Sequence, residues 1–282
     1  MIIIKTRIIV SAILLPIFFV VLFVLPTYVL TVILSVICAI AAFELIKATK
    51  IENKRVLVYT IISAVFIPFA VLIGAVFSPM MLVTLLLSVF FFLISLLVIE
   101  AVLSIKSEKV FKFRKIPIAL AGGILIPLML SALVGLKSMT YGHLFVLLPI
   151  IAAFMTDSGA YFTGMAMGKH KPFPNISPNK TVEGFVGGII TGTIGMMIYG
   201  IILSYTTPLV VIFPVLIIYG VAGAIVTELG DLVFSLIKRK CGIKDYGNLI
   251  PGHGGALDRF DSMTFAAPTM YLLVTVLPAI VL

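Results

Sequence analysis

Charged side chains are scarce in this chain of 282 residues. They make up 11% of the sequence and 62% of the residues are hydrophobic, whereas an ordinary soluble domain is about 25% charged. A composition this apolar excludes a soluble enzyme and an intrinsically disordered chain. Cysteine is scarce as well. Cys38 lies in an apolar run and Cys241 in a basic segment, so we expect two free thiols and no disulfide framework.

The lack of charge is concentrated in six stretches, at residues 8–43, 56–99, 116–136, 138–156, 184–227 and 262–282. A helix needs about 20 consecutive apolar residues to cross a bilayer. The first, second and fifth stretches are long enough for two crossings each, and the others for one. We therefore predict an all-α, polytopic integral membrane protein with about nine transmembrane helices. Their expected ranges are 8–24, 28–46, 56–76, 80–104, 116–136, 142–162, 185–205, 209–234 and 258–280.

Lysine and arginine are almost missing from every second connection between these helices. Of the 20 basic residues, only Lys137 lies in the first, third, fifth or seventh connection. Cytoplasmic loops carry the excess of Lys and Arg, so we predict a cytoplasmic N-terminus and an outside C-terminus in the cell membrane. The two longest loops, 163–184 and 235–257, then face the cytoplasm. Because topology accounts for the net charge of +9, we expect no nucleic-acid partner.

Acidic residues are few, and all five aspartates lie beyond residue 156. Carboxylates inside a membrane are costly and therefore mark function. Glu228 with Asp231, and Asp258 with Asp261, are spaced three residues apart, which puts each pair on one helical face. The helices that carry them are consecutive and antiparallel, so we expect up to four carboxylates near the cytoplasmic surface. Such a cluster attracts a hard divalent cation, and magnesium prefers one or two carboxylates together with substrate phosphates.

Two other interpretations of these acids stay open. They can pair with Arg239, Lys240 or Arg259 in a purely structural network, or they can line a proton or cation pathway. The pathway fits less well, because no acid lies in the outer half of any predicted helix. Glu44 and Glu100 lie near cytoplasmic helix ends, where their side chains can reach toward the membrane surface. A functional role for either glutamate is the less favoured alternative.

The loop before the last predicted helix places three glycines around one histidine, in the sequence Pro-Gly-His-Gly-Gly at residues 251–255. Glycines let backbone N–H groups approach an anion closely, and a helix N-terminus adds positive charge. His253, Gly254 and Gly255 are therefore predicted to contact phosphate. A flexible interfacial turn is the alternative.

Both long loops also carry cations and hydroxyl groups suited to phosphate: Ser177, Lys180 and Thr181 in the first, and Lys238, Arg239, Lys240 and Lys244 around the second. For Lys240, an anchoring contact with anionic lipid is the alternative that we favour. Residue types alone thus indicate a membrane enzyme with a metal–phosphate site on the cytoplasmic side. A substrate with a phosphate at the membrane surface and apolar tails would fit this site.

The run at residues 235–261 reads SLIKRKCGIKDYGNLIPGHGGALDRFD. It closely resembles the signature of the phosphatidate cytidylyltransferases, the CDP-diacylglycerol synthases. The segment 230–232 (GDL) and the upstream segments 157–161, 168–169 and 176–184 also match, so the resemblance covers roughly residues 155–265. One departure is Ala256, where the family usually carries a larger aliphatic residue.

The resemblance implies transfer of CMP from CTP to phosphatidate, giving CDP-diacylglycerol and pyrophosphate for phospholipid biosynthesis. It also implies a homodimer, and a catalytic region at residues 141–282 that follows N-terminal membrane helices at 1–140. Asp231 and Asp258 would bind Mg²⁺ and a second, monovalent cation such as K⁺, with Glu228 and Asp261 as further candidate ligands. The other implied catalytic residues are Lys238, Arg239, Lys244, Asp245, His253 and Arg259, and the implied substrate- and phosphate-binding residues are Asp157, Lys169, Ser177, Lys180, Thr181, Gly254 and Gly255.

Two other functions remain as alternatives. A CTP-using enzyme that acts on a polyprenol or an ether lipid would share this site and differ only in its lipid cleft. A transporter would instead need polar residues across the whole bilayer and, commonly, repeated halves. The charges of this chain stop at the inner leaflet, which disfavours a transporter.

The predicted orientation can be tested with thiol labelling. The hypothesis places Cys241 in the cytoplasm and Thr207 outside, because of the distribution of basic residues. A membrane-impermeant thiol reagent applied to intact cells should miss Cys241 and label a Thr207→Cys variant. Labelling of Cys241 from outside would reverse the orientation.

Overall fold

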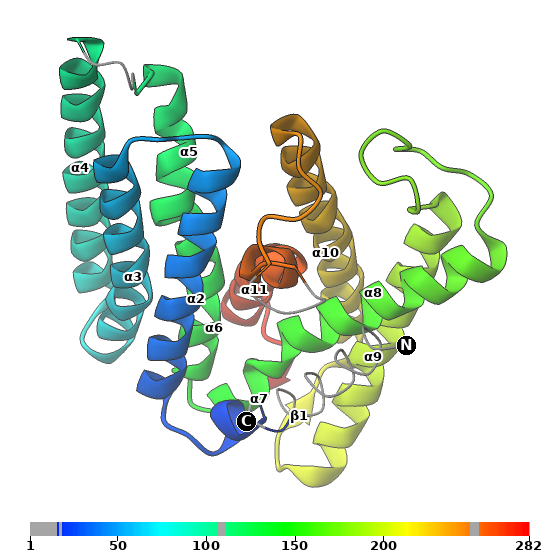
Figure 1. Ribbon diagram of the computed structural model, residues 1–282. Helices are drawn as coiled ribbons and strands as arrows, with labels where there is room; N and C mark the ends of the chain where they lie inside the picture. Colours follow the sequence, from blue (N-terminus) through cyan, green and yellow to red (C-terminus); the bar gives the residue numbers. More distant parts are fainter. Residues whose placement is uncertain (1–15, 17–18, 107–110, 249–253, 282) are drawn as a thin grey trace. The chain divides into compact units, whose positions relative to one another are not determined.

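The computed structural model describes residues 16, 19–106, 111–248 and 254–281 (Figure 1). The chain divides into two compact units. Unit 1 consists of Met1–His143 with Cys241–Phe260, and unit 2 of Leu144–Lys240 with Asp261–Leu282. The functional division at residues 140 and 141 stays a prediction.

Seven described helical segments are long and apolar enough to cross a membrane: Thr27–Ala48, Lys54–Val76, Pro79–Leu103, Phe113–Lys137, Gly142–Met167, Val182–Thr206 and Phe213–Cys241. They match the second to eighth predicted helices in order, which confirms an all-α, polytopic membrane protein. Most of the first predicted helix, 8–24, lies outside the described residues. The last one is present as α11 (Ala256–Val276) but is not among the seven; Asp258, Arg259 and Asp261 in its first turns lower its hydropathy.

Unit 1 is built around α3 (Lys54–Val76). This helix packs against α2 (Thr27–Ala48), α4 (Pro79–Leu103) and α6 (Ile126–Lys137). Between α4 and α6 the chain forms the short turns η1 (Ser104–Lys106) and η2 (Phe113–Lys115), the helix α5 (Ile116–Leu120) and the π-helical turn η3 (Ala121–Leu125). Leu93, Leu97 and Val56 are fully buried in the resulting apolar core.

Side-chain caps determine where two of these helices begin. The Asn53 side chain accepts hydrogen bonds from the backbone N–H groups of Arg55 and Val56, at 2.9 and 3.3 Å. The Ser78 hydroxyl accepts one from Met81 N–H at 3.1 Å, and Pro79 occupies the first helical position. Asn and Ser are typical N-cap residues, because their side chains accept N–H groups that have no partner in the helix. Pro at the first helical position removes one such N–H group.

Lys137, the one basic residue expected on the outer side, caps another helix. Its ammonium donates to the carbonyl oxygen of Leu25 at 2.7 Å and to that of Val21. These carbonyls lie at the end of the helical segment 19–23, where the last carbonyls lack partners within the helix. The Lys137 side chain is buried, so its ammonium serves to satisfy carbonyl oxygens inside unit 1.

Unit 2 contains α8 (Leu147–Met167), α9 (Val182–Thr206), α10 (Phe213–Cys241) and residues 261–276 of α11. The short helix α7 (Gly142–Phe145) precedes α8. Helices α8 and α9 lie side by side, with glycines of one against threonines of the other; a Cβ at Gly187 would overlap the Thr163 side chain. Small residues of this kind allow membrane helices to approach closely.

Several predicted helix boundaries differ from the structure. The predicted loops 163–184 and 235–257 are shorter, because α8 continues to Met167, α9 already starts at Val182 and α10 continues to Cys241. The last helix ends at Val276 rather than at 280. The strand β2 (Ile280–Val281) instead pairs antiparallel with β1 (Val210–Val211), with Val210 opposite Val281.

The capping role of Lys137 predicts a stability effect. Lys137→Met should lower the melting temperature of the detergent-purified protein, because carbonyls left without a donor cost about 1–3 kcal/mol. Lys47→Met, which removes an exposed lysine of α2, is the control and should melt like the wild type. Equal melting of all three proteins would refute the cap.

Candidate functional site

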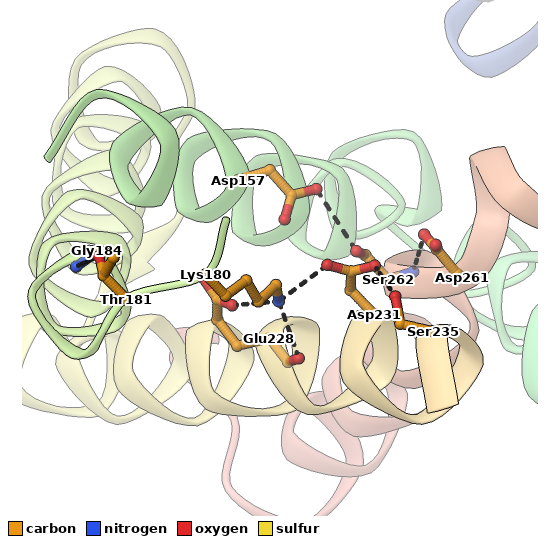
Figure 2. Close-up of polar contacts among 9 residues, drawn as sticks. All are labelled: Asp157, Lys180, Thr181, Gly184, Glu228, Asp231, Ser235, Asp261 and Ser262. Atoms are coloured by element: carbon orange, nitrogen blue, oxygen red, sulfur yellow. Dashed lines mark hydrogen bonds and ion pairs between the residues drawn. The ribbon is translucent and has the colours of Figure 1, made fainter. Parts of the chain in front are cut away.

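An acidic cluster in unit 2 surrounds Lys180. Lys180 lies in the loop between α8 and α9, and its ammonium forms ion pairs with Glu228 Oε2 at 2.5 Å and Asp231 Oδ2 at 2.9 Å. It also donates to the Glu228 carbonyl oxygen at 3.3 Å. Glu228 and Asp231 lie one turn apart on α10, and Figure 2 shows the lysine reaching between them. Glu228 and Asp231 share one helical face, as predicted. Among the described residues, their ion pairs are with Lys180 and not with one of the three cations of the structural alternative, Arg239, Lys240 and Arg259.

The cluster extends to α8 and α11 at Ser262. Ser262 of α11 lies 3.4 Å from Asp157 Oδ2 of α8, and its backbone N–H donates to Asp261 Oδ1 at 2.7 Å. Ser235 lies 3.4 Å from Asp231 Oδ1, on the side away from Lys180 (Figure 2). Asp157, predicted from the resemblance, therefore belongs to the same cluster as Asp231. Neither serine was singled out from the sequence, since isolated hydroxyls carry no pattern.

Negative charge dominates this cluster. Burial by itself lowers the pKa of the Lys180 ammonium, but Asp231 and Glu228 more than offset that effect and raise the pKa above its usual range. Lys180 therefore stays protonated at neutral pH. The cluster holds four carboxyl groups, those of Asp157, Glu228, Asp231 and Asp261, and the charges of two lysines, Lys180 and Lys238, act on them. The cluster can therefore take further positive charge.

The loop that carries Lys180 is held at both ends. Arg239 of α10 donates from Nε to the Ile176 carbonyl oxygen at 3.1 Å. The Thr181 hydroxyl accepts the Gly184 N–H at 3.1 Å and so caps α9. Glu183 accepts the backbone N–H of Lys169 at 3.1 Å, and one of its oxygens lies 2.6 Å from His170 Nδ1. These contacts fix the loop on α9 and α10.

In unit 1, Asp258 fastens the chain that leads into α11. Its Oδ2 accepts the backbone N–H of Tyr246 at 2.8 Å and that of Gly255 at 3.0 Å. The Asp258 side chain is 6% exposed. Gly254 adopts φ +84°, in the left-handed region that favours glycine, and a Cβ there would approach the Asp258 carboxylate. Gly254 and Gly255 thus bring the backbone close to Asp258.

Glu44 of α2 is a second buried carboxylate at this place. It accepts the backbone N–H groups of Ala256 and Leu257, at 3.0 and 2.8 Å, and is 4% exposed. Glu100 is buried as well, against Arg55 and Asn53. The expectation that both glutamates reach toward the surface was therefore wrong. A signal existed for Glu44, which is the only acidic residue among the first 51.

The other predicted residues are less constrained. Ser177 accepts the Lys180 backbone N–H at its carbonyl oxygen, at 3.2 Å. Lys238 and Arg239 lie in the last turn of α10. Lys169, Lys244, Asp245 and Arg259 have exposed side chains. His253 lies outside the described residues, so its contact with phosphate stays a prediction.

The donors fit a hard cation by their chemistry. Within the described ranges, no three His, Cys, Asp or Glu side chains are arranged to hold a metal ion. Magnesium does not require such a cage, since it is held by one or two carboxylates plus waters and substrate phosphates. The excess of carboxylate over ammonium around Asp231 suits that mode of binding. Asp231 belongs to unit 2 and Asp258 to unit 1, so their joint binding of one ion stays a prediction.

These observations define a class of protein: a polytopic membrane protein with acidic and lysine side chains at the ends of its helices. The chain belongs to the Cytidylyltransferase family, whose profile it matches over residues 5–277. It is 44% identical over 133 residues to the phosphatidate cytidylyltransferase of Bacillus subtilis, a match that covers 47% of this chain and 48% of the relative. It is 46% identical over 129 residues to that of Staphylococcus saprophyticus, covering 46% and 48%. The matched region thus spans about half the length of these curated relatives.

The ion pair of Lys180 with Glu228 predicts strong coupling. Lys180→Met leaves the Glu228 carboxylate, 2% exposed, without its cation, which costs about 3–5 kcal/mol for a buried pair. The melting temperature should fall clearly, and Lys180→Met combined with Glu228→Gln should recover part of the loss. Lys169→Met, an exposed lysine of the same loop, serves as the control. Melting of Lys180→Met at the wild-type temperature would contradict the pairing.

Proposed function

We propose that this protein transfers CMP from CTP to phosphatidate, forming CDP-diacylglycerol and pyrophosphate at the cytoplasmic face of the cell membrane. The family match over residues 5–277 carries the proposal. The activity in the names of the relatives supports it, as does a fold that keeps ionic groups near the ends of apolar helices. A phospholipid substrate presents its phosphate at that depth while its acyl chains stay in the bilayer.

In this reaction a phosphate oxygen of phosphatidate bonds to the α-phosphorus of CTP, and the bond from that phosphorus to the oxygen bridging to the β-phosphorus breaks. The electron pair leaves with pyrophosphate. Phosphoryl transfer of this kind depends on positioning and on neutralising charge more than on covalent chemistry by the protein. Lys180, Lys238, Arg239, Lys244 and Arg259 are the cations proposed to bind the phosphates. Asp157, Asp245 and Asp261 are proposed to orient cations or water.

Asp231 and Asp258 are the residues proposed to hold Mg²⁺, with Glu228 and Asp261 as further ligands and a monovalent cation such as K⁺ nearby. Bound magnesium would neutralise charge on the phosphate oxygens. Lys180 already orients the Asp231 and Glu228 carboxylates through its two ion pairs. The protein's own contribution is thus a set of fixed carboxylates at the ends of packed helices. We also propose that the protein acts as a homodimer.

The test is an assay of the purified protein with CTP labelled at the α-phosphate and phosphatidate in mixed micelles. Formation of labelled CDP-diacylglycerol and release of pyrophosphate are expected. Polyprenyl phosphate and an archaeal-type ether phosphatidate, offered in parallel, test the other lipid classes. A clear preference for either over phosphatidate would replace the proposed substrate, and no product with any of them would refute the activity.

Asp231→Asn and Asp258→Asn test the proposed metal ligands. Asn keeps an oxygen that can accept the bonds from Lys180 or from Tyr246 and Gly255, but it loses the charge that binds a hard cation. Each variant should lose at least about 100-fold in activity, which corresponds to roughly 3 kcal/mol. The double variant should be scarcely worse, because ligands of one ion act as a unit. Wild-type activity of the folded single variants, measured at the magnesium concentration that suffices for the wild type, would exclude this role.

A further inference from the structure

Helix α11 begins without a capping side chain at the residue that precedes it. That residue is Gly255, which offers no side-chain oxygen to the first N–H groups of the helix. Such groups need an acceptor when they are buried, and Ala256 and Leu257 are both buried. The acceptor is Glu44, which lies 212 residues earlier in the sequence than Ala256. Its Oε1 accepts the Ala256 N–H and its Oε2 the Leu257 N–H.

The glycines around Glu44 make room for its carboxylate. A Cβ at Gly255 or at Gly247 would lie well inside van der Waals contact with the Glu44 side chain. Gly255 has no positive φ in the structure, so close approach is what requires glycine there. Part of the glycine content of this loop therefore serves an internal carboxylate. Of the glycine N–H groups predicted to receive phosphate, that of Gly255 already has an acceptor in Asp258.

Glu44 and Asp258 share the helix start between them. Asp258 reaches back to the Gly255 N–H, as the third residue of a helix does in a capping box, and Glu44 takes the two N–H groups between them in sequence. Four consecutive residues, 255–258, are thus fixed by two carboxylates. The Asp258 side chain cannot turn without losing its bonds to Gly255 and Tyr246, and Glu44 holds the two residues between Gly255 and Asp258.

We infer that Glu44 is a positioning residue for the reaction: it caps α11 from α2 and thereby holds Asp258 in the orientation in which it acts. The inference rests on the proposed function for the role of Asp258. The contacts of Glu44 themselves do not depend on that function.

Glu44→Gln is the sharpest variant, because it keeps the size of the side chain. Each Glu44 oxygen accepts a different N–H, so the amide nitrogen of Gln would face a donor whichever way it turned. Glu100→Gln is a matched control in the same unit. Glu100 is 2% exposed, and its two oxygens also take one partner each, Arg55 at 3.2 Å and Asn53 at 3.1 Å. It touches neither α11 nor Asp258 in any of these contacts.

Two measurements on the purified full-length proteins test the inference. In hydrogen exchange without magnesium, peptides covering residues 254–260 should exchange about tenfold faster or more in Glu44→Gln than in wild type, as expected for loss of a charge-assisted bond. In the CTP–phosphatidate assay, the magnesium concentration for half-maximal rate should rise by a similar factor. Glu100→Gln should leave both values unchanged, even if it melts earlier.

A purely structural role for Glu44 gives a different result. Less folded protein would then be obtained, with wild-type exchange at 254–260 and wild-type magnesium dependence per folded molecule, and this outcome overturns the inference. Equal shifts in Glu100→Gln overturn it as well. If Glu44→Gln does not fold, Glu44→Asp should show both shifts to a smaller extent, and wild-type values in it are also contrary. A wild-type protein inactive on CTP and phosphatidate refutes the proposed function, while the exchange measurement still decides whether Glu44 holds the helix start.

Discussion

The structure depends on one constraint: a polar group removed from water must find its partner within the protein. In a chain this apolar, few partners are available, and the described contacts show how they are shared out. Lys137 takes two carbonyls at a helix end, Glu100 takes Arg55 and Asn53, and Lys180 takes Glu228 and Asp231. Each contact joins elements that are separate in the sequence, so the same bonds that satisfy buried groups also hold the helices together.

This constraint also explains the character of the candidate site. A catalyst for phosphoryl transfer needs fixed charges, and fixed charges near a membrane interior are stable only when they are partnered. In unit 2, Lys180 supplies that partner to Glu228 and Asp231 and leaves the cluster short of positive charge. In unit 1, backbone N–H groups do the same for Glu44 and Asp258 without adding any net charge. Both arrangements hold carboxyl groups in fixed orientations, which is what a site for cations and phosphates requires.

Seven helices could be predicted from the sequence because crossing a membrane demands long apolar runs, and such runs are visible in any window of 20 residues. The carboxylates of the site could be predicted because a charge such as Asp231 stands out in apolar surroundings. Pairing could not be predicted. Lys180 finds Glu228 across 48 residues and Glu44 finds Ala256 across 212, and no local pattern encodes a partner at that distance. The ends of α8 at Met167 and of α10 at Cys241 could not be predicted from the apolar runs either, since helices continue beyond such a run wherever polar residues can still be solvated.

The cap that α2 places on α11 has a consequence for the order of biosynthesis. A ribosome delivers Glu44 before its two donors, 212 residues ahead of the amide of Ala256 and 213 residues ahead of that of Leu257. Until then α2 carries a carboxylate destined for burial without the two N–H donors whose hydrogen bonds it accepts in the finished unit, so that group must stay hydrated or become protonated. The cap therefore forms only after residues 256 and 257 have been made, when they dock onto a helix that was made much earlier. Unit 1 cannot satisfy the Glu44 carboxylate in this way before that point in synthesis.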